Sequence, residues 1–213
     1  MMMLLRPPLF LLLSLCAVVH AADLYVEEGG SGTTCESIED ACGSIQEAID
    51  VSTSTVTSRT TIHVGSGTFI ENIVINKDGL ALQGSGADSS IIVSAGGIDG
   101  VESPEGVPAD IIIDIAAKYV KVDGFTITHP EGVVPTKRDI GIFVKPPAVD
   151  VQLYNLIVER NRTNEEDGTD DDDLEPTTPG SRGLLVYQSP GMYVLDCHLC
   201  RLRTADDDFS RAV

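Results

Sequence analysis

The chain has 213 residues, of which 42% are hydrophobic, and its formal net charge is −19. This length favours one domain with a full hydrophobic core over two domains. The excess of 33 acidic over 14 basic residues argues against partners such as nucleic acids and anionic membrane surfaces, because like charges repel over a Debye length.

The N-terminal segment 1–21 has the pattern of a secretory signal peptide. Arg6 supplies a positive charge, an apolar run covers residues 9–19, and the tripeptide VHA precedes the expected cleavage point. The apolar run is short for a transmembrane helix, and an uncleaved anchor is the alternative. Cleavage leaves a mature chain that begins near Ala22 or Asp23 with a net charge of −20, since the leader removes one basic residue. We therefore expect a secreted, extracellular protein that does not contact the membrane after cleavage.

Four cysteines remain in the mature chain. An even number in an oxidising compartment predicts disulfides, and four cysteines allow three pairings. We expect Cys35 to pair locally with Cys42. Cys197 and Cys200 could form a second disulfide or remain buried thiols, and half of a metal site is the weaker alternative for this pair.

The only helical signal covers residues 44–50, where Ser44 is suited to cap the helix and Glu47 occupies the capping-box position. In the rest of the chain, apolar and polar residues alternate over many short segments, which predicts strands of about three residues. Such short strands need to stack on one another to be stable. The predicted inward-facing sets of two or three residues are Ile62/Val64, Ile73/Ile75, Leu80/Leu82, Ile91/Val93, Ile111/Ile113/Ile115, Val120/Val122, Phe125/Ile127, Ile140/Ile142/Val144, Val151/Leu153, Leu156/Val158, Leu184/Val186 and Tyr193/Leu195.

An internal repeat supports stacking. The segments VKVDGFTI (120–127), VQLYNLIV (151–158) and YVLDCHLC (193–200) align without gaps. Each reads as a strand, a sharp corner and a second strand, which together form one edge of a solenoid coil. This alignment places Tyr193 and Leu195 of the third copy at inward positions.

A polar, acidic segment interrupts the coils at about 161–182 and is expected to be a disordered surface loop. Asn161 begins an N-glycosylation sequon within it. Its carboxylates could bind Ca²⁺, but they lack the spacing of a known calcium loop, and a solvated acidic loop is the alternative. These calcium candidates are Asp170, Asp171, Asp172, Asp173 and Glu175.

The segments SIQEAI (44–49), TIHVGSGTFIENIVINK (61–77) and GLALQGSGADSSII (79–92) together resemble the opening of the pectin-lyase-like superfamily of right-handed parallel β-helices. Their order and spacing are most similar to those of pectin methylesterases. A second similarity is to secreted and surface proteins of unassigned function with Cys-rich N-termini. The resemblance implies an all-β solenoid of six or seven coils over 22–213, with a short N-terminal capping helix.

For activity, the methylesterase resemblance implies two catalytic aspartates, glutamines that hold the oxyanion and an arginine. Where the family has Gln-Asp-Thr-Leu, this chain has NRTN at 161–164, so that Arg162 stands in place of the acid. Arg162 cannot donate a proton at neutral pH. Asp139 and Arg162 remain the candidates for catalytic residues, and His129 is expected to lie in an exposed turn.

These observations favour a secreted β-helix protein associated with extracellular or cell-wall polysaccharide, without a complete active site. The alternative is an enzyme that acts on uronate-rich glycans, as a pectinesterase or a polysaccharide lyase. No cofactor is expected apart from Ca²⁺, and the oligomeric state stays open. The chain stops at Val213 without a recognisable cap, and the expected explanations are a covering partner, missing C-terminal sequence or a truncated gene product.

Overall fold

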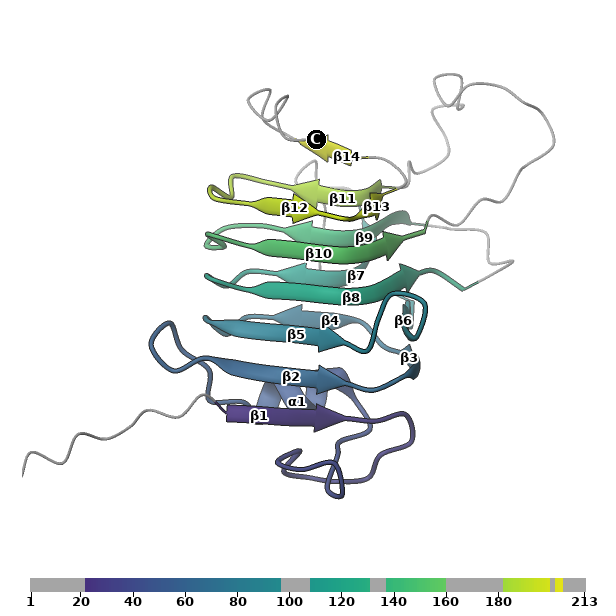
Figure 1. The fold of residues 1–213 in the computed structure, drawn as a ribbon. Helices are drawn as coiled ribbons and strands as arrows, with labels where there is room; N and C mark the ends of the chain where they lie inside the picture. The colour runs from purple at the N-terminus through teal and green to yellow at the C-terminus, as the bar shows by residue number, and fades with distance from the viewer. Residues whose placement is uncertain (1–21, 97–107, 131–136, 160–181, 200–201, 205–213) are drawn as a thin grey trace, which may run out of the picture.

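A computed structural model describes residues 22–96, 108–130, 137–159, 182–199 and 202–204. In these residues the chain forms a right-handed parallel β-helix, in which each coil stacks on the one before it (Figure 1). The predicted fold class is therefore confirmed. Within the described residues, no helix combines the length and the apolarity needed to cross a membrane.

Two parallel sheets form the walls of the helix. In the first sheet, six strands stack in the order β1 (Ala22–Val26), β2 (Thr60–Val64), β5 (Leu80–Gly84), β8 (Lys121–Thr128), β10 (Gln152–Val158) and β12 (Tyr193–Leu195). Three strands extend this sheet around a corner, namely β3 (Gly67–Ile70), β6 (Ser90–Val93) and β13 (His198–Leu199). The second sheet contains β4 (Ile73–Ile75), β7 (Ala109–Ile115), β9 (Arg138–Val144), β11 (Arg182–Val186) and β14 (Leu202–Thr204).

The core consists of columns of apolar side chains that run along the helix axis. In the first sheet, the register places Leu24, Ile62, Leu82, Val122 and Leu153 in one such column, and all five are buried. Burying one aliphatic side chain contributes about 1.5–3 kcal/mol. Because each coil adds one member to every column, the stack supplies the burial that a three-residue strand cannot supply alone.

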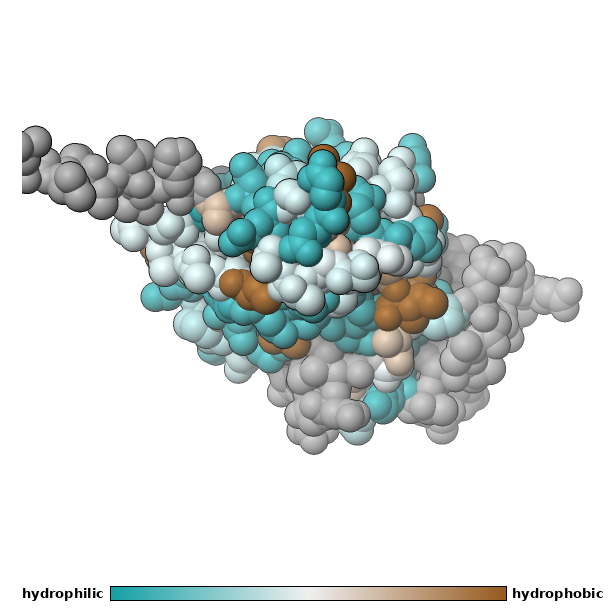
Figure 2. Space-filling view, turned by 90° about the horizontal axis from the view of Figure 1, so that it is seen from below, coloured by the Kyte–Doolittle hydropathy of each residue, from teal (hydrophilic) through white to brown (hydrophobic). Residues whose placement is uncertain are grey.

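Helix α1 (Ile45–Val51) covers the first coil and buries Ile45, Ala48 and Ile49 against it. Ser44 is the N-cap and accepts a hydrogen bond from the Glu47 amide, as the sequence predicts. Viewed from this end, the surface is mainly hydrophilic, and its hydrophobic spots are separate (Figure 2). The helix thus closes the end of the core at the first strands.

The corners that precede strands β5, β8, β10 and β12 of the first sheet each have a left-handed residue. Gly79, Tyr119, Asp150 and Gly191 stack in register and have φ angles of 73°, 57°, 54° and 72°. A left-handed φ favours glycine and is tolerated by Asp and Asn. Because the φ angle is similar at each of these corners, the chain turns in the same way in successive coils.

A second corner lies inside strands β7 and β9. Their pairing runs through Ile111 with Ile140 and resumes at Ile113 with Ile142, so that both strands bend at the position between. Gly141 occupies that position in β9, and a Cβ atom there would lie 2.3 Å from Val158 Cγ1. Close packing therefore favours glycine at this position of β9, whereas β7 has the buried Ile112 at the equivalent position. The bend turns the first part of each strand toward the end of β8.

In two strands, the residues predicted to face inward are wrong by one position. In β6 the buried residue is Ile92, while Ile91 and Val93 are half-buried. In the third repeat copy, Tyr193 and Leu195 are each 55% exposed. The register pairs Leu153 with Val194 rather than with Leu195, which moves every side chain of that strand to the opposite face.

Candidate functional site

The outward side chains of the first sheet form two parallel rows, which we call the outer face. The register aligns one row across β1, β2, β5, β8, β10 and β12 and the second row two residues further along each strand. The first row is Asp23, Thr61, Ala81, Lys121, Gln152 and Tyr193, and the second is Tyr25, His63, Gln83, Asp123, Tyr154 and Leu195. All twelve side chains are half-buried or exposed, so the face is accessible along the described coils.

Neighbouring side chains on the outer face hold one another in place. Tyr25 stacks on His63 with ring centroids 5.3 Å apart, and His63 Nε2 lies 3.2 Å from an oxygen of Asp23. Further along, Lys121 Nζ donates to Asp123 Oδ2 at 2.8 Å and lies 5.2 Å from the centre of the Tyr154 ring. Several aromatic rings and charged groups of the outer face are thus held in place by their neighbours.

An open pocket of about 400 Å³ lies at the edge of the outer face. The turn 85–89 between β5 and β6 forms one wall, and Asn155, Leu156, Ile157 and Asp196 form the other. Ala87 O accepts a hydrogen bond from Thr126 Oγ1 at 2.7 Å, which fixes the turn against β8. The pocket therefore has a defined shape and a largely polar wall.

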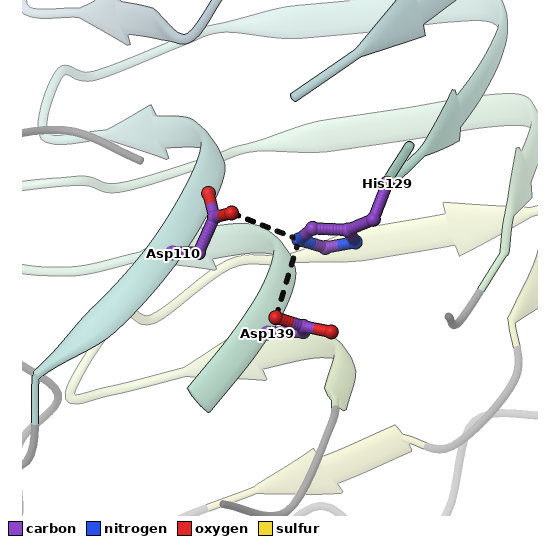
Figure 3. A group of neighbouring side chains, drawn as sticks. All are labelled: Asp110, His129 and Asp139. Atoms are coloured by element: carbon purple, nitrogen blue, oxygen red, sulfur yellow. Dashed lines mark ion pairs between the residues drawn. The ribbon is translucent and has the colours of Figure 1, made fainter. Parts of the chain in front are cut away.

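A second group of polar residues lies at the corner formed by β7, β9 and the end of β8. Asp110 comes from β7, Asp139 from β9, and His129 directly follows β8. His129 Nε2 lies 3.9 Å from Asp110 Oδ2 and 3.9 Å from Asp139 Oδ1 (Figure 3). The exposed fractions of the side chains are 4% for His129, 5% for Asp139 and 15% for Asp110. We call these three residues the corner cluster.

Hydrogen bonds orient one carboxylate of the corner cluster. Ser94 Oγ donates to Asp110 Oδ1 at 2.7 Å, which leaves Oδ2 toward His129. Asn72 Nδ2 lies 3.3 Å from Ser94 Oγ, and it also donates to Ile111 O at 2.6 Å. Asp110 is therefore held by a chain of polar groups from the preceding coil.

The corner cluster has donor atoms of the kinds that bind divalent metal ions. One oxygen or nitrogen from each of the three residues lies within 4.8 Å of the others. Imidazole nitrogen and carboxylate oxygen are ligands for zinc and for other first-row transition metals. Asp139 was a catalytic candidate from the sequence, and the structure places it in this buried group rather than on the outer face.

A further buried carboxylate lies on the second sheet. Asp114 is 3% exposed, and its Oδ2 accepts a hydrogen bond from Lys145 Nζ at 2.6 Å. Burial raises the pKa of Asp114, although the hydrogen bond and the charge of Lys145 act in the opposite direction. Lys145 thus serves as the counterion of this carboxylate.

The structure locates some of the sequence-predicted residues. Cys35 and Cys42 form a disulfide, as expected, with Cα atoms 5.0 Å apart. Cys197 carries a free thiol, which agrees with the thiol alternative and not with a second disulfide at this residue. Burial raises the pKa of this thiol. His129 is buried, so the expectation of an exposed turn is wrong.

The remaining candidates lie outside the described residues, and they stay predictions. They are the catalytic candidate Arg162, the glycosylation site Asn161, the cysteine Cys200, and the calcium candidates Asp170, Asp171, Asp172, Asp173 and Glu175.

Sequence reasoning missed Asp110 and the grouping of the corner cluster. The three residues come from three strand ends, so no local spacing connects them. The sequence does contain a pattern that could have revealed two of them. Asp110 directly precedes the alternating pair Ile111/Ile113, and Asp139 directly precedes the equivalent pair Ile140/Ile142. Aligning those two strands would have placed the aspartates side by side.

Comparison with known proteins yields structural neighbours only. The sequence matches no protein-family model, and no curated protein matches it. A mutant pectin methylesterase in complex with a hexasaccharide is similar to this chain with a TM-score of 0.54 and 14% identity, over 82% of this chain and 48% of that one. Pectin methylesterase PemA from Erwinia chrysanthemi has a TM-score of 0.51 and 14% identity, over 78% of this chain and 48% of that one.

Pectin methylesterase from carrot is similar at a TM-score of 0.50 and 14% identity, over 64% of this chain and 39% of that one. This chain spans about half the length, or less, of these enzymes. Identities this low show a common fold and leave the activity to be argued from the site. The chain therefore shares the parallel β-helix fold with these enzymes.

Proposed function

We propose that this is a secreted β-helix protein that binds a polysaccharide along its outer face and has no complete active site there. The observation that carries the proposal is the pair of in-register rows of aromatic, amide and charged side chains on the first sheet. The leader pattern and the Cys35–Cys42 disulfide support secretion, because disulfides persist in oxidising compartments.

The chemistry of the outer face suits sugar rings. Tyr25, Tyr154 and Tyr193 offer flat, partly apolar surfaces with a polar end, on which a pyranose can stack. Gln83 and Gln152 supply both donors and acceptors for hydroxyl groups. Coils of a parallel sheet repeat every 4.7–4.9 Å or so, and an extended glycan that crosses them meets a new side chain on each coil.

The spacing of carboxylates on the outer face supports binding without turnover. Among the described residues, the carboxylates of the two rows are those of Asp23 on β1 and Asp123 on β8. Strands β2 and β5 lie between them, which separates the two groups by roughly 14 Å. That separation is too large for two carboxylates to act on one bond.

The alternative is an enzyme on uronate-rich glycans, and one observation favours it. Asp123 lies between Gln83 and Tyr154 in the register, with Lys121 at 2.8 Å. A carboxylate beside an amide and a cation could act as a nucleophile or as a base. In this case we propose Ca²⁺ as the cation that a lyase would need, with the acidic run that includes Asp170 as its source of ligands.

Binding is tested with the mature chain and pectin, alginate and neutral plant glucans, by affinity electrophoresis and calorimetry. We expect Tyr154→Ala and Tyr193→Ala each to weaken binding by about tenfold, which corresponds to about 1.4 kcal/mol. Ile70→Ala is the control, because Ile70 is 70% exposed but lies on β3. Equal binding by all three variants and the unmodified chain would contradict the proposal.

Turnover is measured on the same glycans as release of methanol and of unsaturated ends, with and without Ca²⁺. We expect no turnover above a heat-denatured sample. Turnover that Asp123→Asn abolishes would establish the enzymatic alternative and remove the non-catalytic proposal. Turnover that depends instead on Asp139 or Arg162 would assign catalysis to the residues first suggested by the sequence.

A further inference from the structure

We propose that Asp110, His129 and Asp139 bind one divalent transition-metal ion, for which Zn²⁺ is the probe, and that the ion links neighbouring coils. This inference is independent of polysaccharide binding, because the corner cluster lies at the bend of β7 and β9 and not on the outer face.

The state of His129 is the first argument. Its side chain is 96% buried, since its exposed fraction is 4%. Among the described residues, neither ring nitrogen has a hydrogen-bond partner. A buried polar group without a partner costs about 1–3 kcal/mol, and the imidazole is turned toward two carboxylate oxygens (Figure 3). A metal ion bound to Nε2 removes this cost at that nitrogen.

The distances are the second argument. Nε2 lies 3.9 Å from one oxygen of each aspartate, which is too long for a hydrogen bond. Zinc binds histidine nitrogen and carboxylate oxygen at about 2.0–2.2 Å in tetrahedral geometry, which places two ligand atoms of one ion roughly 3.4 Å apart. The observed gaps are slightly longer than this, so binding an ion requires the three side chains to move closer together by roughly a few tenths of an ångström.

Charge is the third argument. Asp110 and Asp139 are paired neighbours on adjacent parallel strands, and like charges at paired positions are destabilising. A divalent cation between the two carboxylates turns the repulsion into attraction.

The supporting shell is the fourth argument. Ser94 holds Asp110 Oδ1 at 2.7 Å, which orients the other oxygen toward His129, and Asn72 approaches Ser94 in turn. Hydrogen bonds of this kind orient metal ligands and typically change metal affinity by about 10–100-fold. One imidazole with two carboxylates favours zinc or manganese over Ca²⁺, which prefers oxygen ligands alone.

The experiment uses the mature chain after removal of metal with a chelator. Calorimetry and metal analysis are expected to give one Zn²⁺ bound through the corner cluster, with little heat from Ca²⁺. His129→Gln and Asp110→Asn should each lower the Zn²⁺ affinity by at least about tenfold, and Ser94→Ala by about tenfold. A hundredfold excess of Zn²⁺ over Kd should raise Tm by about 5 °C or more.

Two controls isolate the cluster. His63→Gln removes a second histidine that, among the described residues, lies beside an aspartate, at 3.2 Å on the outer face. Cys197→Ser removes the thiol of Cys197. Both variants should keep the Zn²⁺ affinity of the unmodified chain. Loss of binding in either control, or unchanged binding in His129→Gln and Asp110→Asn, would overturn the proposal.

A readout on the unmodified chain covers the case in which a cluster variant does not fold. Zn²⁺ should shift the ring NMR signals of His129 and leave those of His63 and His198 in place, with the signals of these two residues identified from His63→Gln and His198→Gln. Absence of Zn²⁺ binding at micromolar concentrations, or a shift confined to His63, would show that the imidazole serves only as a charge partner for the two aspartates.

Discussion

A buried charged side chain needs a partner of opposite charge, and Asp114 is an example in this molecule. Its carboxylate is 3% exposed within a sheet of isoleucine and valine, and Lys145 reaches it at 2.6 Å. Charges of opposite sign in a buried position rarely add much net stability, but removal of one partner is costly, because it leaves the other unpaired.

We expect Lys145→Met to lower the free energy of unfolding at pH 7 by about 3 kcal/mol. Methionine keeps the aliphatic stem and removes the charge. Lys145 lowers the pKa of Asp114 against the raising effect of burial, so the pKa rises further in the variant. A folded-state pKa above the unfolded value stabilises at low pH, and this stability is lost as the pH rises through it.

The decrease in the free energy of unfolding caused by Lys145→Met should therefore be much smaller near pH 4 than at pH 7, as measured by urea unfolding. Lys121→Met is the matched control, because it breaks the more exposed pair with Asp123 and should cost less than about 1 kcal/mol at either pH. An equal loss at both pH values for Lys145→Met would contradict the role of Asp114.

At the scale of elements, the start of helix α1 depends on a residue from the next coil. The Glu71 carboxylate accepts hydrogen bonds from Ser44 Oγ at 2.8 Å and from the amides of Ile45 and Gln46 at 2.8 and 2.9 Å. Its negative charge also suits the positive end of the helix dipole. Glu71 thus connects the capping helix to the strand β4 that follows it.

Glu71→Gln should lower the free energy of unfolding by about 1–2 kcal/mol, because the amide keeps one acceptor oxygen and loses the charge. Glu47→Gln is the control, since Glu47 is exposed and lies in the first turn of the same helix. A surface change of that kind should stay within about 0.5 kcal/mol. Chemical unfolding monitored by circular dichroism measures both, and equal effects would argue against a specific cap.

The same element shows how far sequence reasoning reached. The helix, its Ser44 cap and the alternation of most strands were predictable, because they rest on local periodicity. Glu71 could not be identified as the cap, since it is distant along the chain, and a capping-box pattern pointed to Glu47. In β6, three consecutive β-branched residues carry no alternation, and this explains the wrong phase at Ile92.

The outer face and the corner cluster were harder to predict for a related reason. Apolar and aromatic residues were assigned to the core, whereas Tyr193 and Leu195 face outward. The corner cluster depends on the register of β7 against β9, which becomes visible only once the coils are stacked.

For the whole molecule, net charge sets the conditions under which an acidic glycan can bind. The mature chain carries a net charge of −20, from 33 acidic and 13 basic residues once Arg6 is removed. Its field reaches about 30 Å at about 0.01 M salt and less than 10 Å above about 0.1 M. If the outer face binds polysaccharide, repulsion should oppose a polyuronate at low salt and should leave an esterified, uncharged chain unaffected.

We therefore expect the affinity for unmethylated pectin to rise by about three- to tenfold between about 10 and 300 mM NaCl, because screening removes the repulsion. The affinity for fully methylated pectin should change by less than about twofold over the same range. Calorimetry with a chelator present measures both and prevents bridging by divalent cations. An affinity for unmethylated pectin that falls with salt would show instead that Lys121 on the outer face attracts the uronate, with the local charge outweighing the net charge of the molecule.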